Sequence, residues 1–352
     1  MTGLSARIEV NRGGFRLDAA IDAEPGRITA ILGPNGSGKT TLISAIAGLT
    51  ALDSGRIQIG DVVVDDPDAD TFLPSEERRV GMVFQDYLLF PHLSVRDNIE
   101  FGPRSRLDTR AHEHADEWMA RLDILDLARR SIRDLSGGQA QRVAMARALA
   151  TNPTVLLLDE PLAALDAGTR VEVRRELRSH LGAFTGVTLL VTHDPLDALV
   201  LADDVLILED GRVTQHGATD DVARRPGTPY VATLMGANLL HAMADDGVAR
   251  TDTGVEVAIA DHALTGEIVI VLRPEAISLH RIHPEGSPRN VWPVVVRELE
   301  PRLDRVLVHV EGPPELAVAV TPAAVADLAV SPGARLWAST KALDLDAYPR
   351  QS

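Results

Sequence analysis

The feature that most constrains this chain is a glycine-rich segment at residues 33–40, which reads Gly-Pro-Asn-Gly-Ser-Gly-Lys-Thr. It fits the phosphate-binding pattern G-x-x-x-x-G-K-[ST] at every fixed position. Residues 27–32 end in an apolar run that predicts a buried parallel strand, and residues 41–49 are apolar and free of proline, which predicts a helix. Because strand, loop and helix in this order are the context of a phosphate loop, a chance glycine-rich turn explains the segment poorly.

The residue types of this loop suit a polyphosphate. Gly33, Gly36 and Gly38 allow backbone N–H groups to approach the phosphates closely, and the helix that follows adds its positive N-terminal end. Lys39 supplies a point charge between the β- and γ-phosphates, and Thr40 is a candidate Mg²⁺ ligand. The candidate nucleotide-binding residues here are Gly33, Pro34, Asn35, Gly36, Ser37, Gly38, Lys39, Thr40 and Thr41.

Two adjacent carboxylates follow a second apolar run. Residues 155–160 read Val-Leu-Leu-Leu-Asp-Glu, and a buried strand there delivers Asp159 and Glu160 to its C-terminal end, where ligands bind in open α/β sheets. Asp159 suits the coordination shell of Mg²⁺, and Glu160 suits a general base that polarises an attacking water. The pair favours hydrolysis chemistry in addition to nucleotide binding.

A glycine-rich helix start lies upstream of these carboxylates. Residues 135–139 read Leu-Ser-Gly-Gly-Gln and precede a helical run over 140–150. The N-terminus of such a helix offers N–H groups to phosphate oxygens. The alternative interpretation is an ordinary helix N-cap at Ser136.

These segments resemble the ordered motif set of ABC transporter ATPases when three further features are added. These features are Ala-Leu-Asp at 164–166, His193 after a strand, and Gln85 within Val-Phe-Gln-Asp at 83–86. The resemblance implies an α/β P-loop ATPase that binds ATP and Mg²⁺, with a RecA-like core, an antiparallel β subdomain and a helical subdomain. It also implies a head-to-tail homodimer, or pairing with a different ATPase subunit, because ATP in this family lies between the phosphate loop of one subunit and the Leu-Ser-Gly-Gly-Gln segment of the other.

The resemblance assigns roles residue by residue. Glu160 is the catalytic base, His193 braces the γ-phosphate and the attacking water, and Gln85 senses the γ-phosphate. The implied Mg²⁺ ligands are Thr40, Gln85 and Asp159. The implied contacts to the ATP held by the other subunit are Ser136, Gly137, Gly138 and Gln139, and Asp166 joins the two sites. Phe15 has two equal interpretations, an adenine-stacking aromatic or a core strand residue.

Composition limits the partners that the chain can meet. It has 352 residues, no cysteine and a formal net charge of −16, which disfavours nucleic acid and argues against a disulfide scaffold or a cysteine-based metal site. We expect no signal peptide at the N-terminus and no membrane span, since no apolar stretch reaches 18 residues. The expectation is a peripheral protein at the cytoplasmic face of the cell membrane, held there by a protein partner.

The segment after Gln85 identifies that partner class. Residues 86–99 resemble the groove of importer ATPases that receives a helix of a membrane subunit, and Tyr87 and Phe90 are expected to be exposed there. A simple helix-packing surface is the alternative. The gap between 86 and 135 is too short for the coiled coil of DNA-repair relatives. The resemblance thus implies two integral membrane permease subunits and an external substrate-binding protein, and the other class that remains is a regulatory ABC ATPase without a channel.

The rest of the chain predicts a second, all-β part. We expect an ATPase domain at 1–235 with a helical subdomain at about 86–150, a linker and β segment at 236–283, and a small OB-like barrel at 284–352. Residues 287–291 and 328–342 resemble the molybdate-binding mop version of that barrel, also called TOBE. Candidate oxyanion ligands are Ser287, Arg289, Asn290 and Lys341. For the barrel, the alternative is a role in dimerisation alone. For the transported solute, the alternatives to molybdate are sulfate, iron, sugar and polyamine.

Overall fold

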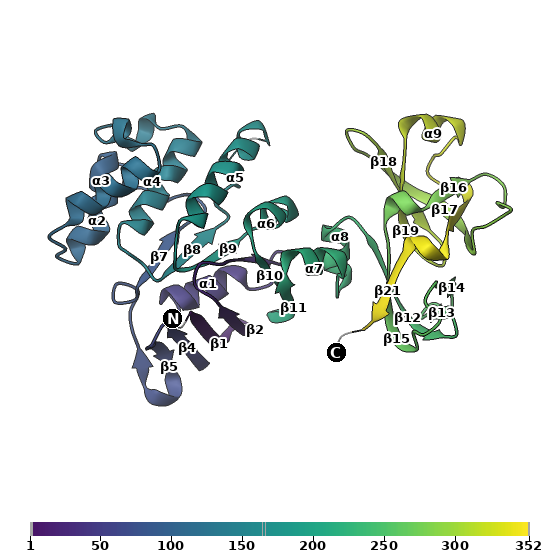
Figure 1. Ribbon diagram of the computed structural model, residues 1–352, viewed down its shortest axis with the longest axis horizontal. Helices are drawn as coiled ribbons and strands as arrows, with labels where there is room; N and C mark the ends of the chain where they lie inside the picture. The colour runs from purple at the N-terminus through teal and green to yellow at the C-terminus, as the bar shows by residue number, and fades with distance from the viewer. Residues whose placement is uncertain (1–2, 164, 166, 351–352) are drawn as a thin grey trace. The chain divides into compact units, whose positions relative to one another are not determined.

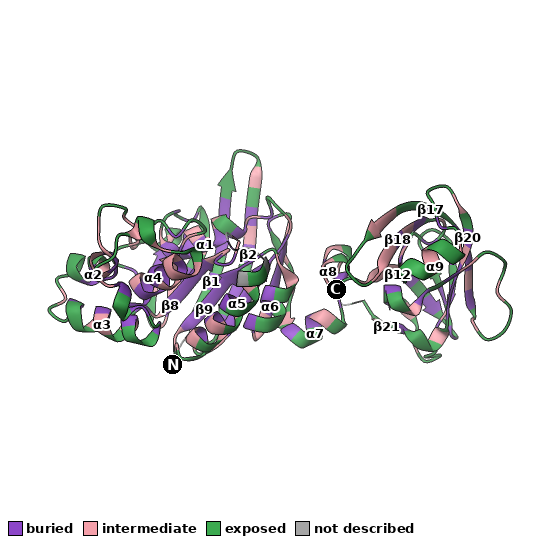
Figure 2. Cartoon of the chain, turned by 90° about the horizontal axis from the view of Figure 1, so that it is seen from above, coloured by how far each residue is buried: buried purple, intermediate pink, exposed green. Residues whose placement is uncertain are grey.

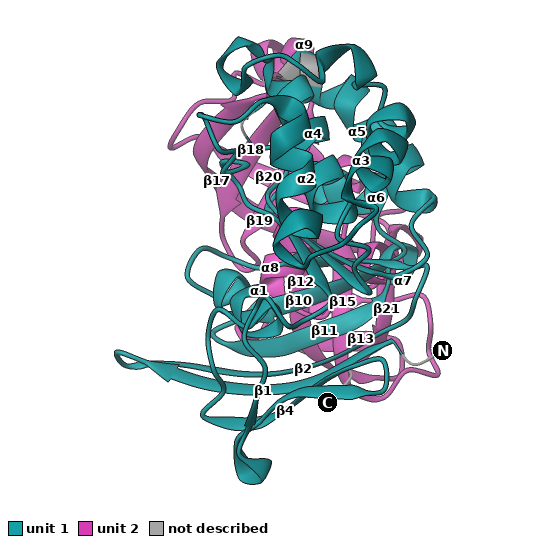
Figure 3. Cartoon of the chain, turned by 90° about the vertical axis from the view of Figure 1, so that its left-hand side faces the viewer, with its two compact units in different colours: residues 1–221 teal, residues 222–352 magenta. Residues whose placement is uncertain are grey.

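The computed structural model describes residues 3–163, 165 and 167–350. The chain divides into two compact units, residues 1–221 and 222–352, which are coloured separately in Figure 3. The predicted boundaries at 235 and 283 differ from this division, because strands on both sides of residue 283 share the core of the second unit.

The first unit is built on a mixed eleven-stranded sheet with the order β6-β5-β4-β1-β2-β11-β10-β3-β9-β8-β7. Its strands are β1 Leu4–Arg12, β2 Phe15–Ala23, β3 Ile28–Leu32, β4 Ser54–Ile59, β5 Val62–Asp66, β6 Thr71–Phe72, β7 Val80–Val83, β8 Val155–Asp159, β9 Val187–Val191, β10 Asp204–Glu209 and β11 Arg212–Ala218. Neighbours from β10 to β7 pair in parallel, whereas β1, β2, β4, β5 and β6 form an antiparallel subdomain. The predicted α/β fold class is confirmed.

The parallel strands read as continuous apolar runs because helices cover them. Every residue of β3 and β9 is buried, and Figure 2 shows β8 and β9 in the buried colour. The helices are α1 Lys39–Ala47, α2 Val95–Ser105, α3 Ala111–Arg121, α4 Gly137–Leu149, α5 Ala167–Gly182, α6 Pro195–Leu201 and α7 Thr219–Arg224. In Figure 1, α2, α3 and α4 gather together, and α2 packs against both α3 and α4, as the predicted helical subdomain requires.

The second unit holds two five-stranded antiparallel sheets around one core. The first has the order β14-β13-β12-β15-β21, and the second has the order β16-β20-β17-β18-β19. The elements are α8 Pro229–Leu234, β12 Asn238–Asp245, β13 Val248–Thr251, β14 Glu256–Ala258, β15 Gly266–Leu272, β16 Ser278–His280, β17 Asn290–Pro301, β18 Val306–Glu311, β19 Leu316–Val320, α9 Pro322–Asp327, β20 Arg335–Thr340 and β21 Leu345–Pro349. Of the helices in the described part of the chain, none is long and apolar enough to cross a membrane.

Candidate nucleotide-binding site

The phosphate loop joins the C-terminal end of β3 to α1. Gly36 and Gly38 adopt φ angles of 80° and 105°, in the left-handed region that favours glycine. A Cβ on Gly33 would lie 2.0 Å from the carbonyl oxygen of Leu208, so the backbone passes too closely for any other residue. The local sequence therefore folds into the close-fitting loop that the pattern predicts.

Lys39 closes this loop. Its Nζ donates hydrogen bonds to the carbonyl oxygens of Gly33 at 2.8 Å and Pro34 at 2.9 Å. Burial lowers the pKa of Lys39, while the carboxylates of Glu160 and Asp159 act in the opposite direction. The buried ammonium binds two carbonyl oxygens, and it can bind phosphate oxygens in their place when a nucleotide enters the loop.

A pocket of about 250 Å³ opens beside the loop. Its lining residues are Phe15, Asn35, Gly36, Gly38, Lys39, Thr40, Thr41, Glu160 and Val191. Phe15 is half-buried, packs against the core and touches the site, since a Cβ on Gly38 would lie 2.9 Å from its ring. Both interpretations of Phe15 thus keep support. Ser37 carries a buried hydroxyl that has no hydrogen-bond partner among the described residues.

The two carboxylates lie at the C-terminal end of β8. Burial, and next the charge of Glu160, raise the pKa of Asp159, while Lys39 lowers it. Glu160 adopts a φ of 46°, a left-handed conformation that costs about 1–2 kcal/mol for a residue with a Cβ. Its Oε2 lies 3.2 Å from Nδ1 of His193, which follows the adjacent strand β9. Strain of this kind gathers at functional sites, and here it aims the carboxylate at His193.

The segment after β7 places Gln85 near the same sheet edge, because β7 pairs in parallel with β8. Gln85 is exposed and does not line the pocket. The expectation that Tyr87 is exposed is wrong. Tyr87 has a φ of 60° and is buried, with 7% of the residue exposed, and its hydroxyl donates to the carbonyl of Pro161 at 3.2 Å. Phe90 is half-buried against Phe101, with 4.5 Å between ring centroids.

Arg147 of α4 is a site residue that the sequence did not indicate. Its guanidinium donates to the carbonyls of Tyr87 and Leu88, both at 2.7 Å. Since α4 begins at the Ser-Gly-Gly-Gln segment, Arg147 ties that helix to the turn after Gln85. An arginine within a helical run gives no sequence signal for such a contact, because most arginines lie on solvated faces.

The Ser-Gly-Gly-Gln segment stands apart from the phosphate loop. Ser136 caps α4 by accepting a bond from the Gln139 N–H at 3.3 Å, and Gln139 Oε1 accepts from the Ser136 N–H at 3.0 Å. Ser136 and Gly137 are exposed, and none of the residues 136–139 lines the 250 Å³ pocket. Asp166 lies outside the described residues. The structure brings together the loop, Glu160 and His193, and leaves 136–139 elsewhere on the surface of this unit.

The candidate oxyanion residues lie where β17 meets β20. Asn290 is 2% exposed, and its amide is engaged with the backbone of Ala258, at 2.7 Å to the N–H and 3.0 Å to the carbonyl. It pairs with Thr340 at the end of the β17–β20 ladder, and Arg289 and Lys341 are the chain neighbours of this pair. Ser287, Arg289 and Lys341 are exposed. Asn290 therefore joins β14 to β17, whereas the other three residues leave polar groups accessible.

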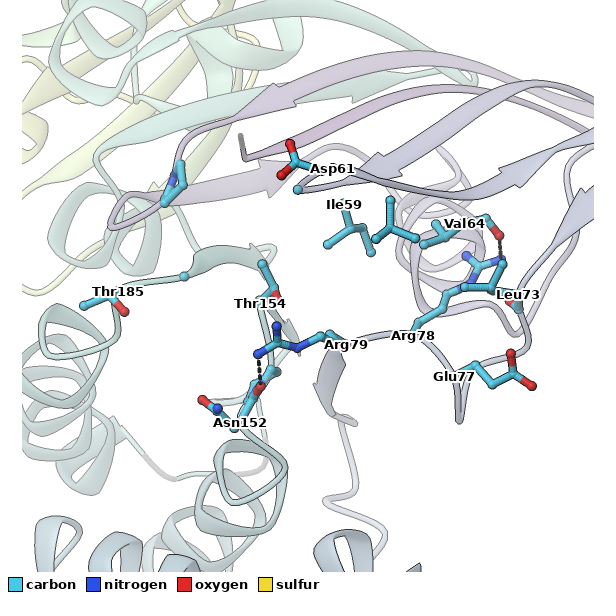
Figure 4. Close-up of a pocket in the computed structure, with 15 residues that line it drawn as sticks. Ile59, Asp61, Val64, Leu73, Glu77, Arg78, Arg79, Asn152, Thr154 and Thr185 are labelled. Atoms are coloured by element: carbon cyan, nitrogen blue, oxygen red, sulfur yellow. Dashed lines mark hydrogen bonds between the residues drawn. The ribbon is translucent and has the colours of Figure 1, made fainter. Parts of the chain in front are cut away.

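A second, larger cavity of about 790 Å³ lies at the opposite edge of the parallel sheet (Figure 4). Its lining includes Arg79, Thr154 and Gly186, which precede β7, β8 and β9. Arg79 is held by the carbonyl of Asn152 at 3.2 Å, a bond drawn in the figure. Nucleotides bind at the C-terminal ends of parallel strands, so this cavity is not the nucleotide site.

Comparison with known proteins defines the class of this chain. The family model described as ABC transporter matches residues 18–163, and the TOBE domain model matches residues 286–346. A nucleotide-free ATP-binding cassette from an ABC transporter superposes with a TM-score of 0.56 at 25% identity, over 66% of this chain and 98% of that one. The chain belongs to the ATP-binding subunits of ABC importers, a family that binds ATP with Mg²⁺.

Full-length relatives are similar to the chain over both units. It is 40% identical to the Molybdenum import ATP-binding protein ModC of Mycobacterium tuberculosis, over 95% of this chain and 94% of that protein. It is 41% identical to the Sulfate/thiosulfate import ATP-binding protein CysA 2 of Agrobacterium fabrum, over 81% of this chain and 83% of that protein. Importer ATPases for different solutes are thus similarly close in identity.

Proposed function

We propose that this protein is the ATP-hydrolysing subunit of a molybdate importer. It works as a head-to-tail homodimer at the cytoplasmic face of the membrane, with two permease subunits and an external binding protein. The observation that carries the ATPase assignment is one pocket lined by Lys39 and Glu160, with His193 3.2 Å from the Glu160 carboxylate. The similarity to ModC over 95% of the chain, including the second unit, supports molybdate over the other solutes.

The residues present fit MgATP. Thr40 offers an exposed hydroxyl at the pocket wall, and Asp159 offers a carboxylate at the C-terminal end of β8, two strands away from β3 in the sheet. Hydroxyl and carboxylate oxygens are donors that Mg²⁺ prefers. Gln85 is the third candidate ligand, from the next strand of the sheet. When bound, Mg²⁺ neutralises charge on the β- and γ-phosphates. Lys39 binds the same phosphates through the ammonium that now bonds Gly33 and Pro34.

Glu160 acts as the general base for the attacking water, and His193 holds the carboxylate and that water in line. Glu160→Gln keeps the shape of the side chain and removes the base. We expect this variant to bind ATP normally and to lose about 10²–10⁴-fold in turnover. Steady-state ATPase assays decide the matter, and turnover near that of the wild type would exclude Glu160 as the base.

The separation of residues 136–139 from the pocket supports the head-to-tail dimer. Ser136 is exposed and free to meet the γ-phosphate bound by a second copy. Glu160→Gln protein should become a compact dimer with MgATP in small-angle scattering or sedimentation. Adding Ser136→Arg should abolish this shift, and a double variant that still closes would contradict the sandwich arrangement.

The second unit senses the transported oxyanion through Ser287, Arg289 and Lys341. Calorimetry on the whole chain should detect molybdate and tungstate, with weaker binding of the smaller sulfate. Arg289→Gln with Lys341→Gln should abolish the heat, since a dianion needs cationic donors. Absence of binding at millimolar molybdate would contradict the sensing role of the second unit but not the import of molybdate. The proposal of molybdate import is wrong if deletion of the gene leaves molybdate uptake unchanged in cells without another molybdate importer. Loss of sulfate uptake in the same cells would favour sulfate as the transported solute.

A further inference from the structure

A cluster of charged side chains lies behind His193, between α5 and α6. Arg174 of α5 donates from Nε to Oδ1 of Asp197 at 2.7 Å, and from its NH2 group to Oδ2 of Asp194 at 3.3 Å. The side chains of Arg174 and Asp197 are only 11% and 7% exposed. One guanidinium thus bridges two carboxylates in a largely buried place.

The two carboxylates fix the backbone on both sides of His193. Oδ2 of Asp197 accepts from the hydroxyl of Thr192 at 3.1 Å, and that hydroxyl accepts from the Asp194 N–H at 3.1 Å. Oδ1 of Asp194 caps α6 by accepting from the Leu196 N–H at 2.9 Å. The residues before and after His193 are therefore held, while the imidazole itself is 56% exposed and reaches Glu160.

The same network reaches the segment that leads into α5. Arg170, one turn before Arg174, donates to the carbonyl of Leu165 at 3.0 Å and lies 3.6 Å from Oδ2 of Asp194. Asp194 therefore receives two arginines of α5. The segment before α5 and the His193 loop therefore share one set of partners.

From this geometry we infer that Arg174 is a positioning residue, which holds His193 against Glu160 through Asp194 and Asp197. The inference rests on the ATPase function proposed above. A buried ion pair contributes little net stability, because desolvation offsets the attraction, so its use here is to fix one geometry. The planar fork of arginine spans two carboxylates, which the single ammonium of lysine does not.

Steady-state ATPase measurements on Arg174→Met test the inference, since methionine keeps most of the packing. We expect kcat to fall about 10–100-fold, the scale of a misplaced catalytic group, with KM for ATP within about 3-fold because the phosphate loop is untouched. The matched control is Arg178→Met. Arg178 also belongs to α5 and binds the far end of α6 through the Leu201 carbonyl and Asp203, so we expect its turnover to stay within about 2-fold.

Combination with His193→Ala separates positioning from a general structural role. If Arg174 acts through His193, Arg174→Met in the His193→Ala background lowers turnover by less than about 2-fold more. A further loss as large as that in the wild-type background would overturn the inference. Failure of the proposed function gives a different result. In that case the wild type does not hydrolyse ATP, or Glu160→Gln hydrolyses it at nearly the wild-type rate.

A readout without catalysis covers the case of poor folding or undetectable residual activity. Hydrogen exchange of the amides of Thr192, His193, Asp194 and Leu196 should quicken about 10-fold in Arg174→Met, while those of α1 stay unchanged. If Arg174→Met does not fold, Arg174→Lys replaces it in this experiment. The lysine reaches only one of the two carboxylates, so the same amides should exchange faster in that variant too. Unchanged exchange at 192–196 in the folded variant would overturn the inference.

Discussion

Replacing Arg78 by Met tests how the phosphate-loop helix is anchored to the antiparallel subdomain. Arg78 lies just before β7 and is fully buried, as is its partner Asp65 at the end of β5. Its guanidinium donates hydrogen bonds to Oδ2 of Asp65 at 3.1 Å and to the carbonyls of Ala45 at 2.7 Å, Ile46 at 3.1 Å, Val64 at 3.2 Å and Leu73 at 2.7 Å. Figure 4 shows this side chain between Val64 and Leu73.

The size of the loss follows from what the substitution leaves behind. The carboxylate of Asp65 stays buried without its cation, and breaking a buried pair from one side costs about 3–5 kcal/mol. The carbonyls of Ala45 and Val64 keep other donors, the N–H groups of Gly48 at 3.1 Å and Leu73 at 2.9 Å, and add little. Each remaining buried carbonyl that loses its donor adds about 1–3 kcal/mol. We expect the free energy of unfolding of the first unit to fall by about 4 kcal/mol or more.

Trp118 of α3 reports this unfolding once Trp292 and Trp337, the other two of the three tryptophans, are replaced by Phe. A urea titration followed by Trp118 fluorescence gives the free energy for the first unit. Arg79→Met is the matched control, because this exposed neighbour makes one backbone bond, to Asn152 at 3.2 Å, and should cost less than about 1 kcal/mol. A loss below about 1 kcal/mol for Arg78→Met would refute the reasoning.

The pH dependence checks the same account independently. Burial raises the pKa of Asp65 above its ordinary value, and Arg78 opposes that shift. A carboxyl with a raised folded pKa contributes stability that is fully present below the unfolded pKa, about 4, and is lost as pH rises through the folded pKa. Without Arg78 the folded pKa rises further, so the deficit of the variant should shrink from pH 8 to pH 5. An equal deficit at both values would show that the carboxylate does not carry the cost.

Three further predictions concern the two units. Tyr87→Phe removes the bond to the Pro161 carbonyl beside Glu160, the proposed base, so ATPase turnover should fall about 3–10-fold and urea stability by about 1 kcal/mol. Asp159→Asn should raise the melting temperature of the nucleotide-free protein at pH 8, because burial raises the pKa of Asp159 and its charged form costs stability; the gain should diminish at pH 5. Asn290→Ala leaves the Ala258 N–H and carbonyl unpaired, so the Trp292 fluorescence transition should lose about 2–4 kcal/mol.

Local patterns account for what the sequence predicted well. The amphipathic run at 111–121 forms helix α3, and the apolar run at 316–320 forms strand β19. A hairpin turn at Gly60 and Asp61 joins β4 to β5. Each of these elements is specified by side-chain periodicity and turn residues within a few positions of itself.

Pairings between distant segments were not predictable in the same way. Strand β21, at 345–349, pairs with β15, at 266–272, and so returns the end of the chain to the first sheet of its unit. The alternation of apolar and polar residues within 345–349 is too short to indicate a strand, and the neighbouring residues do not indicate which strand it pairs with. The strands at 238–251 were missed for a similar reason, since charged residues and a Gly turn interrupt the apolar pattern there. The sequence thus indicated the all-β class of the second unit without its two-sheet arrangement.

The candidate site shows the same division between chemistry and position. The residues proposed to act on phosphate or water lie at loops, and three arginines hold the backbone near them: Arg78 behind the phosphate-loop helix, Arg147 behind the turn after Gln85, and Arg174 behind His193. Each donates to backbone carbonyls or to aspartates within its own unit. An arginine in a sequence is ordinarily expected on a solvated face, because burial of an unpaired charge is costly. That cost is offset only when carbonyl or carboxylate oxygens surround the guanidinium, and these oxygens come from segments far apart in the chain. The motifs therefore predict which groups perform hydrolysis, whereas the geometry that aligns those groups comes from contacts that no motif contains.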